Sequence, residues 1–157
     1  MYTVFVSHST SPEDMPYVTW FHSTLQSRGI GCYVAEWYRE PGRLITDKTK
    51  AAINASDIVL VLWTKGGRDS QFVNQEVGYA EDKKPTIPLV EEGVTLEGFL
   101  YGRDHIEFDR QNPGNALNAT LNYIYNLKLT KEQQERASTA ALVLLGILFL
   151  GAIASSR

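Results

Sequence analysis

The stretch that decides the fold is Asp-Ile-Val-Leu-Val-Leu-Trp at residues 57–63, where an aspartate precedes an unbroken apolar run. A continuous apolar run indicates a strand that is covered on both faces, and such strands lie inside parallel sheets. Strict alternation of apolar and polar residues would indicate a strand with one face in water instead. We therefore predict a central parallel strand at these residues.

Strand-like and helix-like segments alternate on both sides of this run. Helix signals separate the strands, as at Ser70–Lys84, where a serine N-cap opens a helix that Pro85 closes. Strands that alternate with helices imply a doubly wound parallel sheet. We predict a flavodoxin-like α/β fold, in which five parallel strands have helices on both faces and ligands bind beyond the carboxyl ends of the strands. The other predicted strands are Thr3–Val6, Cys32–Ala35, Thr86–Val90 and His105–Phe108.

The composition excludes several classes of protein. The formal net charge is −3 over 157 residues, so the chain lacks the basic surface of a nucleic-acid-binding protein. The single cysteine, Cys32, excludes an internal disulfide. The histidines lack metal-ligand spacing, and the chain has neither a Walker loop nor a dinucleotide-binding glycine fingerprint. We therefore expect no resident metal or cofactor.

The C-terminal end differs in composition from the rest of the chain. Residues 137–156 carry no charged side chain, and Ala140–Ala154 is almost wholly apolar. A helix of about 20 apolar residues spans the hydrocarbon core of a bilayer. We predict a transmembrane helix at residues 137–156, after a folded domain at 1–125 and a helical linker at 126–136. The alternative is a buried core helix or a helix in an oligomer interface.

The charges around this segment predict its orientation. Lys128, Lys131 and Arg136 come before it, and only Arg157 comes after it. The positive-inside bias places basic flanks in the cytoplasm. We therefore expect a single-pass membrane protein whose folded domain is cytoplasmic.

The helix predicted at Ser70–Lys84 carries a candidate functional carboxylate. Glu76 lies in the row beside the apolar stripe of this helix, between Phe72 and Tyr79, so it is placed at the margin of the core. A carboxylate there could face a cleft at the ends of the strands. The alternative, which the residues alone favour, is a solvated glutamate that pairs with a lysine such as Lys83.

Two further polar groups follow predicted strands. The first strand is followed by Ser7, His8 and Ser9. A serine beside a histidine could act as a nucleophile with its general base. Neighbouring side chains point in opposite directions, however, which favours a capping or ligand-contacting role. The loop Glu36–Arg43 follows the second strand and combines aromatic with basic side chains. It could stack a ligand ring or dock a partner, or it could simply cover the edge of the sheet.

Five segments, in this order, resemble the TIR (Toll/interleukin receptor) family. Val4–Ser9 is similar to its first conserved box, with His8 where a tyrosine is usual. Ser70–Ala80 is similar to its Ser-x-Trp-x-x-x-Glu helix, with Phe72 where a tryptophan is usual. No single motif is specific, but the order of all five indicates the family over about residues 1–125. The remaining segments are Arg39–Arg43, Ile53–Leu62 and Thr86–Leu89.

The resemblance implies an activity. Many prokaryotic members hydrolyse or cyclise NAD⁺: they release nicotinamide together with ADP-ribose or a cyclic ADP-ribose product. The helix glutamate is catalytic in these enzymes, so the resemblance assigns that role to Glu76. A carboxylate near the ribose stabilises the cation that departing nicotinamide leaves, and the neutral leaving group needs no general acid. NAD⁺ is then a substrate and not a cofactor, and the residues implied to bind it are Phe5, Ser7, His8, Arg43 and Phe72.

The resemblance also implies partners. Members of the family self-associate, and many act in immune or anti-phage defence. Some are non-catalytic signalling scaffolds, so the alternative function is a module that recruits other TIR or effector proteins to the membrane. A third reading, a flavodoxin-like phosphate receiver, is weakened because Ser7, His8 and Ser9 stand where its acidic cluster would be needed.

Overall fold

The computed structural model describes residues 1–34 and 46–155, and side chains are described as far as residue 145 and at residue 147. The chain divides into two units, Met1–Leu121 and Asn122–Arg157. The first unit contains the sheet and the candidate site, and each unit is described by itself below.

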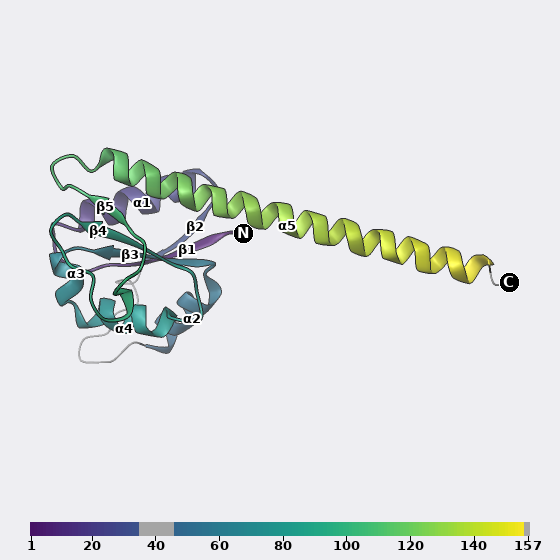
Figure 1. The fold of residues 1–157 in the computed structure, drawn as a ribbon, viewed down its shortest axis with the longest axis horizontal. Helices are drawn as coiled ribbons and strands as arrows, with labels where there is room; N and C mark the ends of the chain where they lie inside the picture. The colour runs from purple at the N-terminus through teal and green to yellow at the C-terminus, as the bar shows by residue number, and fades with distance from the viewer. Residues whose placement is uncertain (35–45, 156–157) are drawn as a thin grey trace. The chain divides into compact units, whose positions relative to one another are not determined.

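A single parallel sheet forms the centre of the first unit (Figure 1), and its strand order is β2-β1-β3-β4-β5. The order and the parallel pairing confirm the predicted flavodoxin-like α/β arrangement. All residues of β3 are buried, as its continuous apolar sequence requires of the central strand. The strands are β1 (Thr3–Ser7), β2 (Gly31–Val34), β3 (Ile58–Trp63), β4 (Thr86–Glu91) and β5 (Ile106–Phe108).

Helices cover both faces of this sheet. In Figure 1, α2 and α4 lie on one face and α1 lies on the other. Each helix turns an apolar stripe inward, as Val73 and Val77 do in α4. The helical elements are α1 (Met15–Ser27), α2 (Asp47–Ala55), α3 (Lys65–Asp69), α4 (Gln71–Ala80), η2 (Gly98–Leu100) and α5 (Gly114–Ser155).

Hydroxyl side chains begin three of these helices. Each accepts a hydrogen bond from a backbone amide in the first turn, which satisfies a donor that has no partner inside the helix. Because of this capping, the residues just after β3 form the short helix α3. The capping residues are Thr46 for α2, Thr64 for α3 and Ser70 for α4.

The helix predicted to end at Lys84 is shorter than expected. It ends at Ala80, and a turn that contains Asp82 at a φ of 60° leads into β4. A left-handed backbone conformation cannot continue a right-handed helix. The sequence signal used for the end was Pro85, which limits a helix without marking its last residue.

One part of the core lies between the sheet and the α2–α4 layer. Phe5, Val59, Val61 and Trp63 point into it from the strands, and α4 contributes Val73, Val77 and Ala80. Side chains of a strand alternate between its two faces, so Ser7 shares the face of Phe5 and points toward α4. The pleat therefore directs one polar side chain at the carboxyl end of β1 into this layer.

The helix α5 is continuous from Gly114 to Ser155 and belongs to both units. The transmembrane helix predicted at residues 137–156 lies partly outside the described side chains. Among the described residues, the structure has no helix long and apolar enough to cross a membrane, so these residues do not support that prediction. Large apolar side chains that are 56% to 70% exposed in this region are Leu142, Val143, Leu144, Leu145 and Ile147.

Candidate functional site

Glu76 lies inside α4 and is almost completely buried, with 2% of its surface exposed. This excludes the alternative in which it is a solvated glutamate paired with a lysine. The ammonium groups of Lys83 and Lys84 donate instead to the backbone oxygens of Tyr79 and Asn54, at 2.9 and 2.7 Å. The solvated glutamate that the residues alone favoured is therefore wrong, and Glu76 lies deeper than the margin of the core at which helical spacing placed it.

The hydroxyl of Ser7 holds the Glu76 carboxylate. Ser7 Oγ donates a hydrogen bond to Glu76 Oε2 at 2.5 Å, across 69 positions of sequence, and Ser7 is fully buried. A hydrogen bond to an ionised acceptor is short and strong, and an unpaired buried carboxylate would be costly. The last residue of β1 and the middle of α4 therefore meet in one buried contact.

The neighbours of Ser7 have different partners. His8 is fully buried, and its Nδ1 lies 2.5 Å from the backbone oxygen of Ser9. A carbonyl oxygen only accepts hydrogen bonds, so Nδ1 is the protonated ring nitrogen in this contact. Ser9 Oγ donates to Asp14 Oδ2 at 2.5 Å and accepts from the Ser11 amide at 3.2 Å. Ser7 thus pairs with Glu76 and not with His8, and Ser9 binds Asp14 and the Ser11 amide in the turn before α1.

The structure places the remaining predicted residues as follows. Phe5 is fully buried in the core layer beneath α4. Phe72 is half-buried and precedes Glu76 by about one turn of α4. Arg43 and the rest of the loop after the second strand lie outside the described residues.

Sequence reasoning missed a second buried carboxylate, Asp14, which is fully buried. It accepts hydrogen bonds from Thr64 Oγ1 and from Arg110 Nη2, both at 2.7 Å, in addition to Ser9. The same guanidinium bonds the carboxylate of Glu91 through Nε and Nη2, at 2.5 and 3.0 Å. The hydrogen bond to Glu91 and the one to Asp14 raise the pKa of Arg110 against the opposing effect of burial. The available signal was a polar residue at or just after the end of each of four strands, namely Ser9, Thr64, Glu91 and Arg110.

The single cysteine, Cys32, is half-buried in β2. Burial raises the pKa of the Cys32 thiol to about 12, so it carries almost no thiolate at neutral pH. Among the described residues, no group of three histidine, cysteine, aspartate or glutamate side chains is arranged to hold a metal ion.

The family model of the TIR domain matches residues 4–121. The chain belongs to the TIR domain family. Two solved structures have the same fold as this TIR domain. One is a prokaryotic SEFIR domain, at a TM-score of 0.60 and 20% identity over 80% of this chain and 93% of that chain.

The second is the TIR domain of the Toll-related receptor TRR-2 from Hydra magnipapillata. It has a TM-score of 0.62 and 17% identity, over 80% of this chain and 99% of that chain. No protein with a curated description matches this chain. At these identities the likeness to the two solved structures concerns the fold alone.

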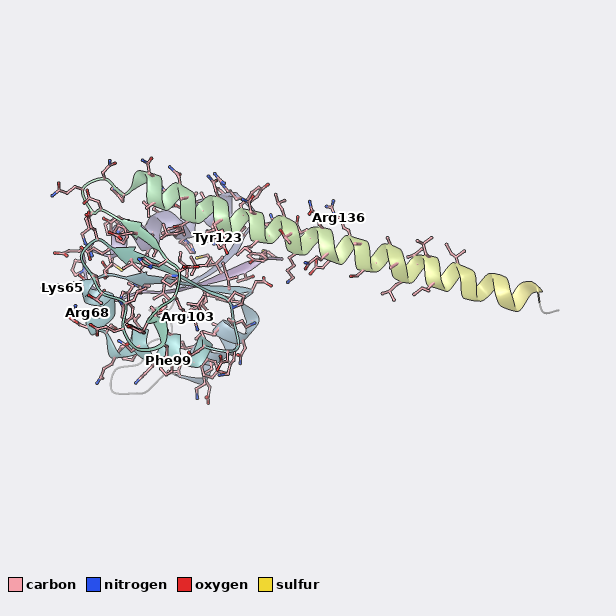
Figure 2. The ribbon with its side chains drawn as sticks, viewed as in Figure 1. Lys65, Arg68, Phe99, Arg103, Tyr123 and Arg136 are labelled. Atoms are coloured by element: carbon pink, nitrogen blue, oxygen red, sulfur yellow. The ribbon has the colours of Figure 1, made fainter. Side chains whose placement is uncertain are left out.

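Glu76 lines neither of two surface grooves of this TIR protein. One, of about 670 Å³, is lined by residues 94–96 and 101–105 between β4 and β5. Phe99 and Arg103 belong to the same connection (Figure 2); the Phe99 ring packs on Gly78 of α4, and Arg103 pairs with Glu81 at 3.7 Å. No residue of the Ser7–Glu76 contact lines this groove.

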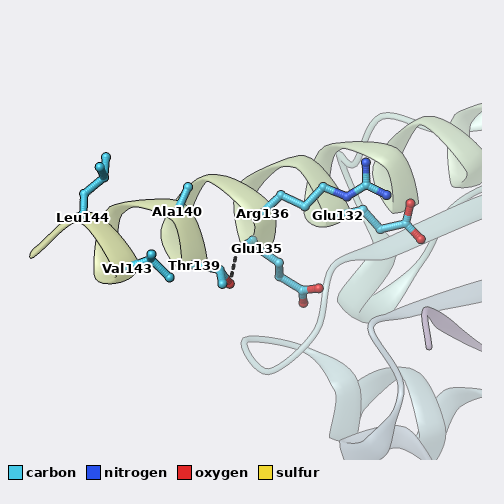
Figure 3. A pocket seen from close by; sticks show the side chains of 7 residues that line it. All are labelled: Glu132, Glu135, Arg136, Thr139, Ala140, Val143 and Leu144. Atoms are coloured by element: carbon cyan, nitrogen blue, oxygen red, sulfur yellow. Dashed lines mark hydrogen bonds between the residues drawn. The ribbon is translucent and has the colours of Figure 1, made fainter. Parts of the chain in front are cut away.

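The other groove, of about 840 Å³, lies on α5 within the second unit (Figure 3). All of its lining side chains come from one helix, and a single helix presents a convex surface on which polar groups cannot converge. We therefore assign no site to it. Its lining residues are Glu132, Glu135, Arg136, Thr139, Ala140, Val143 and Leu144.

Proposed function

We propose that this TIR domain cleaves NAD⁺ between nicotinamide and ribose, with Glu76 as its catalytic carboxylate. The observation that supports the proposal most is the buried hydrogen bond of 2.5 Å from Ser7 to Glu76. It joins the first box of the family to the helix glutamate. A carboxylate whose orientation is already set does not have to reorganise when positive charge develops beside it.

The proposed reaction needs one carboxylate and no resident cofactor. The bond between the ribose and the nicotinamide nitrogen breaks, and its electron pair stays with the nitrogen, so nicotinamide leaves as a neutral ring. Positive charge then develops on the ribose, and the Glu76 carboxylate stabilises it. Attack by water with loss of a proton gives ADP-ribose, and attack by a nucleophile of the same molecule gives a cyclic product.

The burial of Glu76 adds a requirement to this proposal. With 2% of its surface exposed, Glu76 has to become accessible before its carboxylate can contact a ribose. We propose that association between copies of the domain supplies this change. NAD⁺ cleavage per molecule is then expected to rise with protein concentration, whereas a monomeric enzyme would show constant specific activity.

The deciding experiment is NAD⁺ consumption by the full-length protein and by Glu76→Gln. Removal of one electrostatic stabiliser of a transition state costs about 10²–10³ in rate, so we expect a loss of that size. The matched control is Glu81→Gln, which makes the same chemical change just after α4, where Glu81 pairs with Arg103 at 3.7 Å. The control is expected to retain activity within about twofold. Equal activity of the wild-type protein and Glu76→Gln would contradict the proposal.

A non-catalytic TIR signalling module is the second candidate, and the near-complete burial of Glu76 favours it. Such a module would recruit other TIR proteins through its surface. It predicts no loss of NAD⁺ at any protein concentration and unchanged self-association in Glu76→Gln. Concentration-dependent NAD⁺ cleavage that the variant lacks would exclude it.

Membrane attachment and a role in immune or anti-phage defence stay predictions from the sequence. A flotation experiment with anionic vesicles tests the first of them. We expect the full-length protein to float with the vesicles and a chain truncated after residue 136 to stay in the dense fraction. Flotation of neither protein would contradict membrane attachment.

A further inference from the structure

The strand order of the sheet places a topological switch point between β1 and β3. Ligands of doubly wound sheets commonly bind in the crevice at such a point. In this chain the carboxyl ends of the two strands are joined there by buried hydrogen bonds. Asp14 Oδ2 accepts from Ser9 Oγ, just after β1, at 2.5 Å and from Thr64 Oγ1, just after β3, at 2.7 Å.

The Arg110 guanidinium extends this connection across the sheet. Its Nη2 donates to Asp14 Oδ1 at 2.7 Å, and its Nε and Nη2 bind the carboxylate of Glu91 at the end of β4. Its Nη1 donates to the backbone oxygen of Glu13 at 3.0 Å. The guanidinium makes four hydrogen bonds in all, whereas a lysine ammonium has only three donors and could not make them.

Close packing around Asp14 leaves no room for a larger group. A Cβ atom on Gly66 of α3 would lie 2.8 Å from Ser9 Oγ and 3.4 Å from Asp14 Oδ2. A Cβ atom on Gly67 would lie 2.3 Å from the backbone oxygen of Leu62. A ligand at the switch point would therefore have to displace buried hydrogen bonds.

We propose that Asp14 and Arg110 are positioning residues, which hold the carboxyl end of β1 so that Ser7 stays against Glu76. Ser9 is bound to Asp14, and only His8 separates it from Ser7. A restraint at Ser9 therefore limits the motion of Ser7. The kinetic part of this inference rests on the proposed NAD⁺ cleavage, whereas the restraint itself can be measured without any activity.

Hydrogen–deuterium exchange of the full-length protein measures the restraint. We expect the amides of residues 7–14 to exchange roughly tenfold faster in Asp14→Asn, because the variant loses the charge that Arg110 binds. Ser9→Ala removes one hydroxyl and provides a milder variant if Asp14→Asn does not fold. The matched control is Arg103→Lys, which alters an arginine ion pair in the β4–β5 connection. Wild-type exchange at residues 7–14 in Asp14→Asn, or in Ser9→Ala when only that variant folds, would overturn the inference.

NAD⁺ kinetics separate positioning from general stability. We expect kcat of Asp14→Asn to fall roughly tenfold with KM within about twofold, and no further fall when it is combined with Glu76→Gln. Faster exchange with an unchanged kcat would overturn the positioning role. If the wild-type protein does not cleave NAD⁺, the proposed function fails, and the exchange experiment alone decides whether Asp14 restrains Ser7.

Discussion

Two buried carboxylates lie near the carboxyl end of β1, and they are held in different ways. Glu76 accepts a hydrogen bond from the neutral Ser7 hydroxyl at 2.5 Å. Asp14 accepts from two hydroxyls and forms an ion pair with Arg110 at 2.7 Å. A neighbouring cation offsets the cost of burying a charge more fully than a hydroxyl does. We expect loss of the Asp14–Arg110 ion pair to affect the stability of the domain more than loss of the Ser7–Glu76 hydrogen bond does.

The largest expected effect on stability comes from removing Arg110, the cation of the ion pair with Asp14. Arg110→Met is expected to lower the free energy of unfolding by about 3 kcal/mol, because it leaves the Asp14 charge buried without its ion partner. Urea unfolding measures this change. Arg103→Met breaks the more exposed pair with Glu81 and is expected to cost less than about 1 kcal/mol. Equal losses in the two variants would show that the Asp14 pair is an ordinary surface contact.

Exchanging each carboxylate for its amide tests the contrast directly. Asp14→Asn is expected to lower the free energy of unfolding by about 1–3 kcal/mol, because Arg110 loses a charged acceptor. Glu76→Gln is expected to change it by less than about 1 kcal/mol, because the amide oxygen still accepts the Ser7 hydrogen bond. Thermal unfolding of both variants in parallel provides the comparison. The reverse order would exchange the roles assigned to the two residues.

The close approach of α3 to the side chains of Ser9 and Asp14 provides a third test, which measures how tightly these side chains are held. Gly66→Ala is expected to cost about 1–3 kcal/mol, because its Cβ would lie 2.8 Å from a hydroxyl that Asp14 holds in place. At Gly114 no atom lies within 4 Å of the added Cβ, so Gly114→Ala is expected to be neutral or slightly stabilising. Denaturant unfolding distinguishes the two variants. A neutral Gly66→Ala would mean that the Ser9 side chain can move freely.

The smallest effect is expected on the Glu76 side. Ser7→Ala removes a single hydroxyl and is expected to cost about 1 kcal/mol of stability. Its NAD⁺ cleavage is expected to fall more than its stability suggests, by roughly tenfold, because Glu76 loses the group that orients it. Parallel unfolding and NAD⁺ assays measure both changes. A loss of stability with full activity would show that orientation by Ser7 is not needed.

The sequence predicted the α/β framework and singled out Glu76, one of the two buried carboxylates. The apolar run at residues 57–63 indicated the central strand, and β3 confirms it. Helical spacing placed Glu76 beside an apolar stripe and thus toward the core. The short turn after Ala80 was not predicted, because Pro85 limits how far the helix can extend without marking its last residue.

Asp14 was missed for a different reason. Its partners Ser9, Thr64 and Arg110 are separated from it by 5, 50 and 96 positions, so no local pattern connects them. An aspartate before a helix has the ordinary appearance of an N-cap. Only the order of the strands brings these residues to one edge of the sheet.

The sequence by itself determined the class of fold, the alternation of strands and helices and the membership of the TIR family, because these depend on local periodicity and on motifs in a fixed order. The tertiary structure alone decided that Ser7 pairs with Glu76 and that Asp14 pairs with Arg110. Both pairs join residues far apart in the chain. The parallel register and the pleat set which side chains meet, and neither can be read from one segment of sequence.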